Sequence, residues 1–216
     1  MSTAAQINQI TRPLLECDPR FVLLKRWLVI RPVGHWLCAY NLDRRTEKGV
    51  FIVEANVMPL YGSARRMKLV WDVYPPRSAG VEGTWYAATP HVDRHLIEVM
   101  AGNGSSALTQ FDSPDMFLAG LASSSNLSKV EAAIHTFALA GRLREAIYLA
   151  KKKIATCRVP PYVYALHVGY VRRLERLVAV FEAGQARTNR LLRTFEWISV
   201  RKHGVEQWWS WTPIAT

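Results

Sequence analysis

Hydrophobic and polar residues alternate over residues 49–61, and this stretch has the clearest strand pattern in the chain. Its apolar residues recur at every second position, among them Phe51, Val53 and Val57. A period of two predicts a strand with one buried face, which Pro59 is expected to end. Other strand-like segments lie on both sides of it along the chain, so we expect this strand to be central to a sheet.

Four other segments have the composition or the alternation of β-strands. They cover residues 21–30, 35–42, 67–74 and 84–89. Short turns separate them, and successive strands with short turns predict an antiparallel meander instead of alternating strands and helices. A helix that ends near Cys17 is expected to precede the sheet, with Pro13 kinking or shortening it.

After Pro90 the apolar residues take helical spacing. The predicted helices cover residues 91–100, 116–121, 127–140, 142–156, 162–183 and 186–200. The motif DSPD at residues 112–115 is typical of a helix start, and Gly141 is expected to turn a helical hairpin. The sequence therefore predicts an α+β fold, with a mainly antiparallel sheet and flanking helices in residues 1–125 and a basic helical lobe in residues 126–216. We expect one cooperative unit, because each part has an apolar side that needs cover.

The tail at residues 207–213, QWWSWTP, holds three of the eight Trp residues of the chain. Large aromatic rings need apolar surfaces to contact. We therefore expect the tail to pack back across the folded chain and to couple its two parts.

The net charge of +11 is distributed unevenly. Residues 1–126 contain 13 Lys and Arg against 11 Asp and Glu, whereas residues 127–216 contain 15 against 6. The first part therefore has a formal charge of +2 and the second a formal charge of +9. Such an excess favours an acidic partner or nucleic acid, and a basic lobe that is merely solvated is the alternative.

The last predicted helix places its basic residues on one side. At about 100° per residue, one arc holds Arg187, Arg190, Arg193, Trp197 and Arg201. An adjacent arc holds Leu191, Phe195 and Ile198, with Leu192 beside it. We expect the apolar arc to face the core and the basic arc to bind, because guanidinium groups and an indole suit phosphates, bases or acidic protein surfaces. A solvated basic face with its Trp packed against a neighbour is the alternative.

No catalytic or cofactor motif is present in a recognisable form. His91 and His95 are four residues apart, a spacing that can hold a metal on a helix, but the Glu of the HExxH pattern and a third ligand are missing. We therefore expect no catalytic residue, no metal site and no cofactor. The three scattered cysteines favour free thiols in a reducing cytoplasm, and we expect neither a signal peptide nor a transmembrane segment.

Several stretches resemble a known group of proteins. They are the opening helix INQITRPLL, the Trp-bearing strands KRWLVI and HWLCAY, the strand FIVEANVMPLY and the later helix FDSPDMFLAGL. In the order of these elements, about the first 120 residues resemble small uncharacterised bacterial proteins linked to toxin–immunity systems. The resemblance implies a binding protein. Immunity proteins against basic nucleases are commonly acidic, whereas this chain is basic, so the resemblance does not imply a nuclease target.

Three functional hypotheses follow, in order of preference. The first is a non-catalytic, cytoplasmic interaction protein that binds and occludes an acidic protein partner, with immunity-type neutralisation of a toxin or effector as its form. The second is a nucleic-acid-binding protein that uses the basic C-terminal helices. The third is a metal-dependent hydrolase or nuclease that uses His91 and His95.

Overall fold

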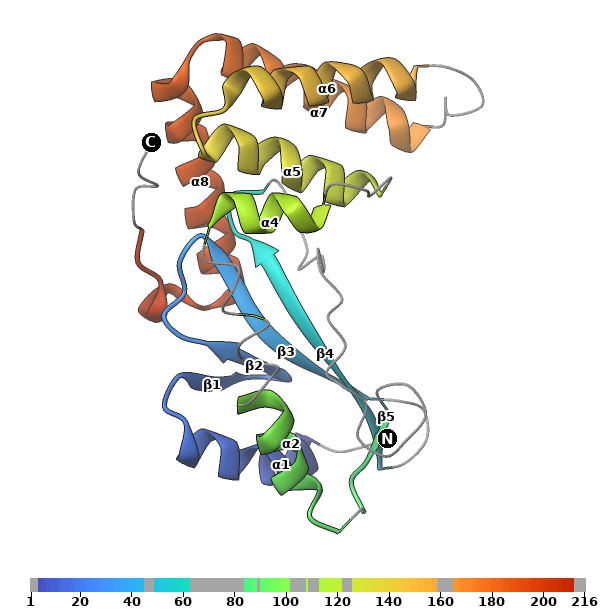
Figure 1. Ribbon diagram of the computed structural model, residues 1–216, viewed down its shortest axis with the longest axis vertical. Coiled ribbons are helices and arrows are strands. Elements are labelled where there is room, and N and C mark those ends of the chain that lie inside the picture. Colours follow the sequence, from blue (N-terminus) through green and yellow to red (C-terminus); the bar gives the residue numbers. More distant parts are fainter. Residues whose placement is uncertain are drawn as a thin grey trace. The chain divides into compact units, whose positions relative to one another are not determined.

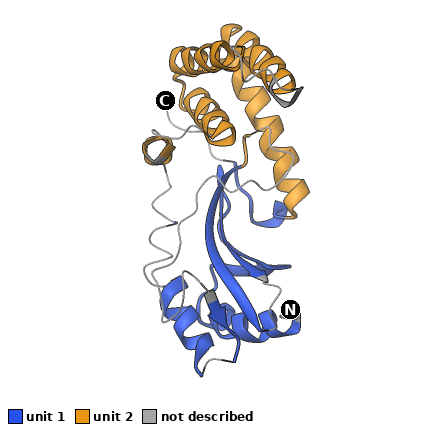
Figure 2. Ribbon diagram, turned by 90° about the vertical axis from the view of Figure 1, so that its right-hand side faces the viewer, with its two compact units in different colours: residues 1–59, 67–111, 205–211 blue, residues 60–66, 112–204, 212–216 orange. Residues whose placement is uncertain are grey.

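The computed structural model describes residues 4–44, 49–62, 84–88, 90–101, 108, 113–121, 126–158 and 165–211. The chain divides into two compact units (Figure 2). The first, which we call the sheet unit, consists of Met1–Pro59, Met67–Phe111 and Val205–Trp211. The second, the helical unit, consists of Leu60–Arg66, Asp112–Gly204 and Thr212–Thr216. The strand predicted at residues 67–74 lies outside the described residues.

The described part of the sheet has five antiparallel strands in the order β1-β2-β3-β4-β5 (Figure 1). The strands are β1 Phe21–Leu24, β2 Trp27–Ile30, β3 Trp36–Arg44, β4 Val50–Pro59 and β5 Thr84–Tyr86. Each strand pairs with the next one along the chain, which is the predicted meander. This sheet is followed by helices, and the predicted α+β fold with a helical C-terminal part is confirmed.

Two strand predictions differ from the structure. The stretch predicted as one strand at residues 21–30 is a hairpin, because Lys25 and Arg26 turn the chain between β1 and β2. Lys25 takes a left-handed backbone conformation with φ 61°. The two consecutive charged residues interrupt the apolar run and are the local signal for this turn. The second difference is that β3, and not β4, has the middle place in the described sheet.

Strand β4 is buried on both faces, whereas the alternation predicted one buried face. Ile52 and Asn56, on the face opposite the predicted apolar set, are also buried. Glu54 is half-buried, and Asn41 on β3 donates a 3.2 Å hydrogen bond from Nδ2 to its carboxylate. Asn56 donates to the carbonyl of Glu54 at 2.9 Å. The side-chain NH₂ groups of Asn41 and Asn56 are thus satisfied within the sheet, whereas the Oδ1 atoms of both are buried without a hydrogen-bond partner among the described residues.

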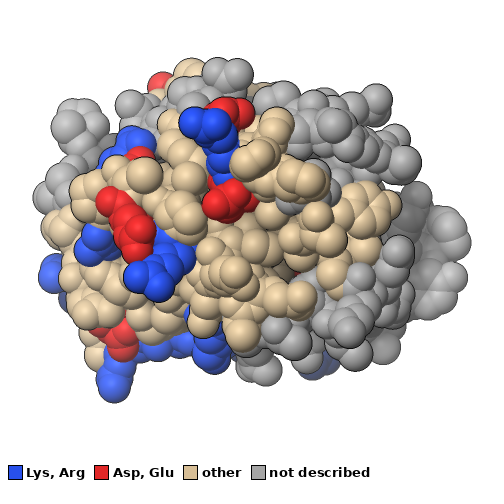
Figure 3. All heavy atoms as spheres, turned by 90° about the horizontal axis from the view of Figure 1, so that it is seen from below, with Lys and Arg blue, Asp and Glu red and all other residues tan. Residues whose placement is uncertain are grey.

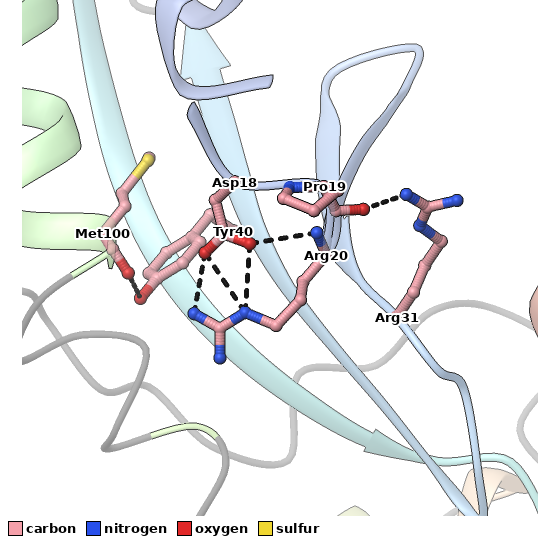
Figure 4. A network of polar contacts seen from close by, with 6 residues as sticks. All are labelled: Asp18, Pro19, Arg20, Arg31, Tyr40 and Met100. Carbon is pink, nitrogen blue, oxygen red and sulfur yellow. Dashed lines mark hydrogen bonds and ion pairs between the residues drawn. The ribbon is translucent and has the colours of Figure 1, made fainter. Parts of the chain in front are cut away.

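Two helices belong to the sheet unit: α1 Ala4–Cys17 packs against β1, and α2 Val92–Val99 packs against α1. The side of α1 that is buried consists of Ile7, Ile10, Thr11 and Leu14. The helix continues through Pro13. Tyr40 on β3 donates a 3.2 Å hydrogen bond to the carbonyl of Met100, directly after α2 (Figure 4). This bond joins the middle strand of the described sheet to the end of α2.

A polar cluster holds the link between α1 and β1 (Figure 4). Asp18 accepts hydrogen bonds from the backbone N and the guanidinium of Arg20, at distances between 2.7 and 3.1 Å. These bonds lower the pKa of the Asp18 carboxyl below its usual value. Arg31, which follows β2, donates to the carbonyl of Pro19. The contacts of this cluster fix the direction in which the chain enters the sheet.

The aromatic tail packs back against the sheet unit, as predicted. Val33 and Trp209 form a parallel β-bridge. The backbone N of Val33 donates to the carbonyl of Trp208 at 2.9 Å, and the N of Ser210 donates to the carbonyl of Val33 at 3.0 Å. The short 3-10 helix η2, Glu206–Trp208, leads into this bridge. The tail thus belongs to the same unit as the first strands.

The helical unit contains α4 Pro114–Leu121, α5 Leu127–Leu139, α6 Leu143–Cys157, α7 Ala165–Glu182 and α8 Gln185–His203. Each corresponds to a predicted helix. At the start of α4 the hydroxyl of Ser113 accepts a 3.3 Å hydrogen bond from the backbone N of Met116, as the DSPD motif predicts. The α5–α6 hairpin turns at Gly141, whose φ of 76° suits glycine. None of the described helices has the length and apolar composition that a membrane span requires.

Small side chains line the contact between the helices of this unit. The buried alanines are Ala132, Ala133 and Ala138 on α5 and Ala146 and Ala150 on α6. Tyr61, which precedes α4 in the chain, also belongs to this core and places its hydroxyl 2.8 Å from Oγ1 of Thr136. Thr136 donates its own proton to the carbonyl of Ala132 at 2.7 Å, so Tyr61 is the donor to Thr136.

Candidate partner-binding face on helix α8

Helix α8 begins and ends next to glycines with positive φ. Gly184 precedes it with φ 103°, and Gly204 follows it with φ 70°. The last turn contains Arg201 and Lys202, and cations at this position interact favourably with the partial negative charge of a helix C-terminus. These residues define a 19-residue helix that contains all the predicted binding residues.

The buried face of α8 differs from the predicted one. Its buried residues are Thr188, Leu192, Glu196, Ser199 and Val200. Phe195 is half-buried, with its ring edge-on to His135 at a centroid distance of 6.0 Å, whereas Ile198 is 51% exposed. The prediction that Ile198 faces the core is therefore wrong. Polar residues occupy three of the five buried positions, so a pattern based on hydrophobicity alone misplaces the centre of the buried face.

The opposite face of α8 carries the residues predicted to bind, and we call it the basic face. Its members Arg187, Arg190, Arg193, Trp197 and Arg201 are all exposed. Arg201 lies over the indole of Trp197, with its Cζ 4.8 Å from the ring centroid. At a rise of about 1.5 Å per residue, the basic face is about 21 Å long from Arg187 to Arg201. The structure brings these residues onto one surface, and their role in binding stays a prediction.

The basic face presents cations without exposed carboxylates. The one acidic residue of α8 is Glu196, which is 1% exposed on the buried face. Within the described part of the chain, no ion pair involves Arg187, Arg190 or Arg201. Their charges are therefore available to a partner and repel one another when none is bound.

The carboxylates on the neighbouring helices are paired within the helical unit. Ion pairs join Arg142 to Asp115 at 2.9 Å and to Glu145 at 2.5 Å, Arg173 to Glu131 at 2.9 Å, Lys151 to Glu182 at 2.7 Å, and Arg158 to Glu175. These pairs account for every acidic residue of α4 to α7. Among the described helices of this unit, α8 is the one whose exposed charges are all positive.

The sheet unit carries mixed charge. Its described ion pairs join Arg12 to Glu16, Arg20 to Asp18, and Arg26 to Asp43. Figure 3 views the sheet unit from the side of α1 and α2, and basic and acidic side chains lie next to one another there. The uneven charge of the sequence therefore points to the helical unit, and within it to α8.

His91 and His95 are not both part of a helix. Helix α2 begins at Val92, and His91 precedes it in a left-handed conformation with φ 59°. The contact between the two residues is a backbone one, in which the N of His95 donates to the carbonyl of His91 at 3.1 Å. No group of three His, Cys, Asp or Glu side chains in the described ranges is placed to hold a metal ion. The hypothesis of a metal-dependent enzyme gains no geometric support from these residues.

A hollow of about 270 Å³ lies beside His91 in the sheet unit. It is lined by Gln6, Gln9, Ile10, Ala87, His91, Val92 and Asp93. The ionisable residues His91 and Asp93 are not buried there, and water competes for their hydrogen bonds. The hollow therefore has no desolvated charged group that would select a ligand.

The thiols of the described chain are free. Cys38 donates a 3.6 Å hydrogen bond from Sγ to the carbonyl of Leu108, and burial raises the pKa of its thiol to about 12. Nucleophilic cysteines need a lowered pKa, because the thiolate is the reactive form. Cys38 is therefore a packing residue of the sheet unit.

In comparisons with known proteins, no family model, no curated protein and no solved structure matches this chain. The resemblance to toxin–immunity proteins thus stays a hypothesis.

Sequence reasoning misses one member of the exposed surface, Ile198. It follows Trp197 directly and is about as exposed, at 51% against 49%. A signal for this exposure is present in the sequence, because three of the residues one turn away from Ile198 are Thr194, Arg201 and Lys202. An apolar residue with polar neighbours one turn away is as typical of a binding surface as of the boundary of a hydrophobic core.

Proposed function

We propose that this chain is a non-catalytic interaction protein that binds an acidic surface of a partner protein through α8 and acts by covering it. The observation that carries the proposal is a helix face with arginines, an indole and no exposed carboxylate among its described residues. Planar guanidinium groups pair bidentately with carboxylates, and Trp and Arg are enriched among the residues that dominate binding energy at protein interfaces. Neutralisation of a toxin or effector is the form of occlusion that we propose.

We place this activity in the cytoplasm. The free cysteines support this proposal, and Cys17 among them is exposed. Exposed thiols persist in reducing compartments, whereas oxidising ones favour disulfides.

The first prediction concerns the arginines of the basic face. Replacing Arg187, Arg190 and Arg193 by Gln should weaken the binding of fluorescein-labelled poly-L-glutamate about tenfold at low salt. Each exposed charge pair contributes about 0.5 kcal/mol, and about 1.4 kcal/mol corresponds to a tenfold change in affinity. Fluorescence anisotropy of the labelled polymer measures the loss, and far-UV circular dichroism verifies the fold of the variant.

A matched control removes the same charge from other helices of the same unit. Arg144, Arg172 and Arg176 are exposed on α6 and α7, and their replacement by Gln should change the affinity less than about threefold. Equal losses in the two variants would mean that net charge, and not the basic face, attracts the polymer. A double variant, Arg187→Gln with Arg190→Gln, repeats the measurement without changing Arg193, which has further contacts.

Nucleic-acid binding is the second candidate, and the exposed indole favours it. Trp197 is 49% exposed beside arginines, and unpaired bases stack on such rings. The discriminating probe is a single-stranded thymidine oligonucleotide with the same charge as the poly-L-glutamate. Tighter binding of the oligonucleotide, with a log–log salt slope that falls by about two in the variant lacking three arginines, would favour this candidate over the first.

A further inference from the structure

Two large apolar side chains lie next to each other in the exposed surface of α8. Trp197 is 49% exposed and Ile198 is 51% exposed, and we call them the apolar pair. The other large apolar residues exposed in the described chain are Tyr86, Met116, Tyr148, Val168 and Trp211. None of these is next to another in sequence, and those of the helical unit lie on three different helices. Trp197 and Ile198 are thus the one pair of consecutive large apolar residues that is exposed among the described residues.

Cationic groups surround the apolar pair. Arg201 lies one helical turn from both residues, and its guanidinium covers part of the Trp197 ring. Lys202 lies one turn from Ile198 and is exposed, and Arg190 lies about two turns before the pair on the same face. An apolar centre with a polar, charged rim is the usual anatomy of a protein interface, in which the rim excludes water from the centre.

The apolar pair and the surrounding cations suit some kinds of anionic partner better than others. A phosphate backbone pairs with the arginines, and a base stacks on Trp197, but neither covers the aliphatic side chain of Ile198. A purely acidic surface pairs with the arginines and leaves both apolar residues in water. A protein segment with large apolar side chains between its carboxylates satisfies both the charges and the apolar pair.

Resting on the proposed function, we infer that α8 binds an acidic segment of the partner protein that carries at least one large apolar side chain between its carboxylates. The apolar side chain covers Trp197 and Ile198, and the carboxylates pair with Arg187, Arg190 and Lys202. The basic face, about 21 Å long, matches about four turns of helix or about six residues of extended chain. Because the basic face runs along α8 from Arg187 to Arg201, the segment lies along the helix.

Two synthetic peptides of equal negative charge test this inference. Both are labelled with fluorescein and have Glu flanking two central positions, which are Leu and Phe in one peptide and Ser in the other. With the full chain at physiological salt, the Leu/Phe peptide should bind at least about tenfold tighter, because two half-exposed apolar side chains leave water on binding. The Ile198→Gln variant should remove most of this difference by weakening the binding of the Leu/Phe peptide.

The control variant is Met116→Gln, which changes an equally exposed apolar residue on α4 and should leave both affinities unchanged. Equal binding of the two peptides by the unmodified chain would overturn this inference but leave the proposed function standing. The same holds if Ile198→Gln preserves the full difference between the peptides. Binding of the thymidine oligonucleotide but of neither peptide would overturn both proposals, as would binding of none of the three probes.

Discussion

At the scale of single residues, His135 is the most unusual member of the helical core. It lies on α5 with no exposed surface, and neither ring nitrogen has a hydrogen-bond partner. Burial lowers the pKa of its imidazole to about 4, with Glu131 opposing and Arg173 adding to the shift. The ring is therefore neutral at physiological pH and packs edge-on to Phe195 as an apolar side chain would.

The buried imidazole makes the helical unit sensitive to acid. The pKa in the folded chain lies below the unfolded value of 6.5, so on acidification the unfolded chain binds the proton first. Stability should fall as the pH drops from about 6.5 to about 4, by about 3 kcal/mol in total. The His135→Leu variant should lose much of this dependence, as measured by urea unfolding monitored by circular dichroism at several pH values.

A second histidine provides the comparison for this measurement. The pKa of His203 is also lowered, by burial and by the neighbouring Lys202, so its titration has the same sign. The His203→Gln variant should retain most of the acid sensitivity, because His203 is only half-buried at the end of α8. Retention of the full acid dependence by His135→Leu would show that other groups cause it.

The exposed residues of α8 differ in how well the sequence predicts their exposure. The exposure of the basic face is predictable, because an arginine side chain is almost never fully buried unless it is paired. The exposure of Ile198 is indicated only by its polar neighbours one turn away, and hydrophobicity alone misses it because Glu196 and Ser199 take the buried positions next to it. Burial of a carboxylate depends on contacts with other helices, and helical periodicity contains no information about them.

At the scale of elements, a glycine inside α7 and a glycine at the end of α8 have opposite effects on stability. Gly169 lies inside α7 with open space around an added Cβ, so Gly169→Ala should stabilise the chain by up to about 1 kcal/mol. Gly204 ends α8 with φ 70° and has equally open space. Gly204→Ala should destabilise by about 1 kcal/mol, because only the backbone conformation opposes the methyl group. Differential scanning calorimetry measures both changes.

The same comparison has a clear contrary result. If both variants shift the melting temperature in the same direction, the backbone conformation of the two glycines does not determine the effect of the added methyl group on stability. The Gly204→Asn variant adds a test, because asparagine tolerates the left-handed conformation better than alanine and should cost less.

The elements themselves follow from local signals to different degrees. The helices α5 to α8 are long and periodic, so their existence is predictable from the sequence alone. The β1–β2 hairpin is harder, because its strands have four residues each and its turn is the charged pair Lys25-Arg26 with no glycine. The burial of β4 on both faces depends on what covers the sheet, and a strand pattern does not contain that information.

At the scale of the whole molecule, the two units exchange segments of chain. Residues 60–66 belong to the helical unit although they follow β4, and Val205–Trp211 belong to the sheet unit although they follow α8. Leu60 and Tyr61 have no exposed surface, and Tyr61 hydrogen-bonds to Thr136 in the helical core. No single cut in the chain therefore yields both units complete.

Truncation tests this interleaving. The predicted lobe, residues 126–216, lacks α4 and residues 60–66, so the isolated fragment should not fold cooperatively, because the buried Phe117 and Leu121 of α4 are also missing. The full chain should unfold in one thermal transition, which calorimetry measures. A stable, cooperatively melting fragment 126–216, or two well-separated transitions in the full chain, would contradict the prediction.

The bridge between Val33 and Trp209 has a consequence for biosynthesis. Val33 leaves the ribosome early, whereas its partner is translated only after the residues that build α4 to α8. The backbone groups of Val33 must therefore stay hydrated while most of the polypeptide is still being made. Nascent helices, which need only local contacts, form during this interval. We expect the helical unit to acquire its hydrogen bonds during translation and the sheet unit to complete its own last.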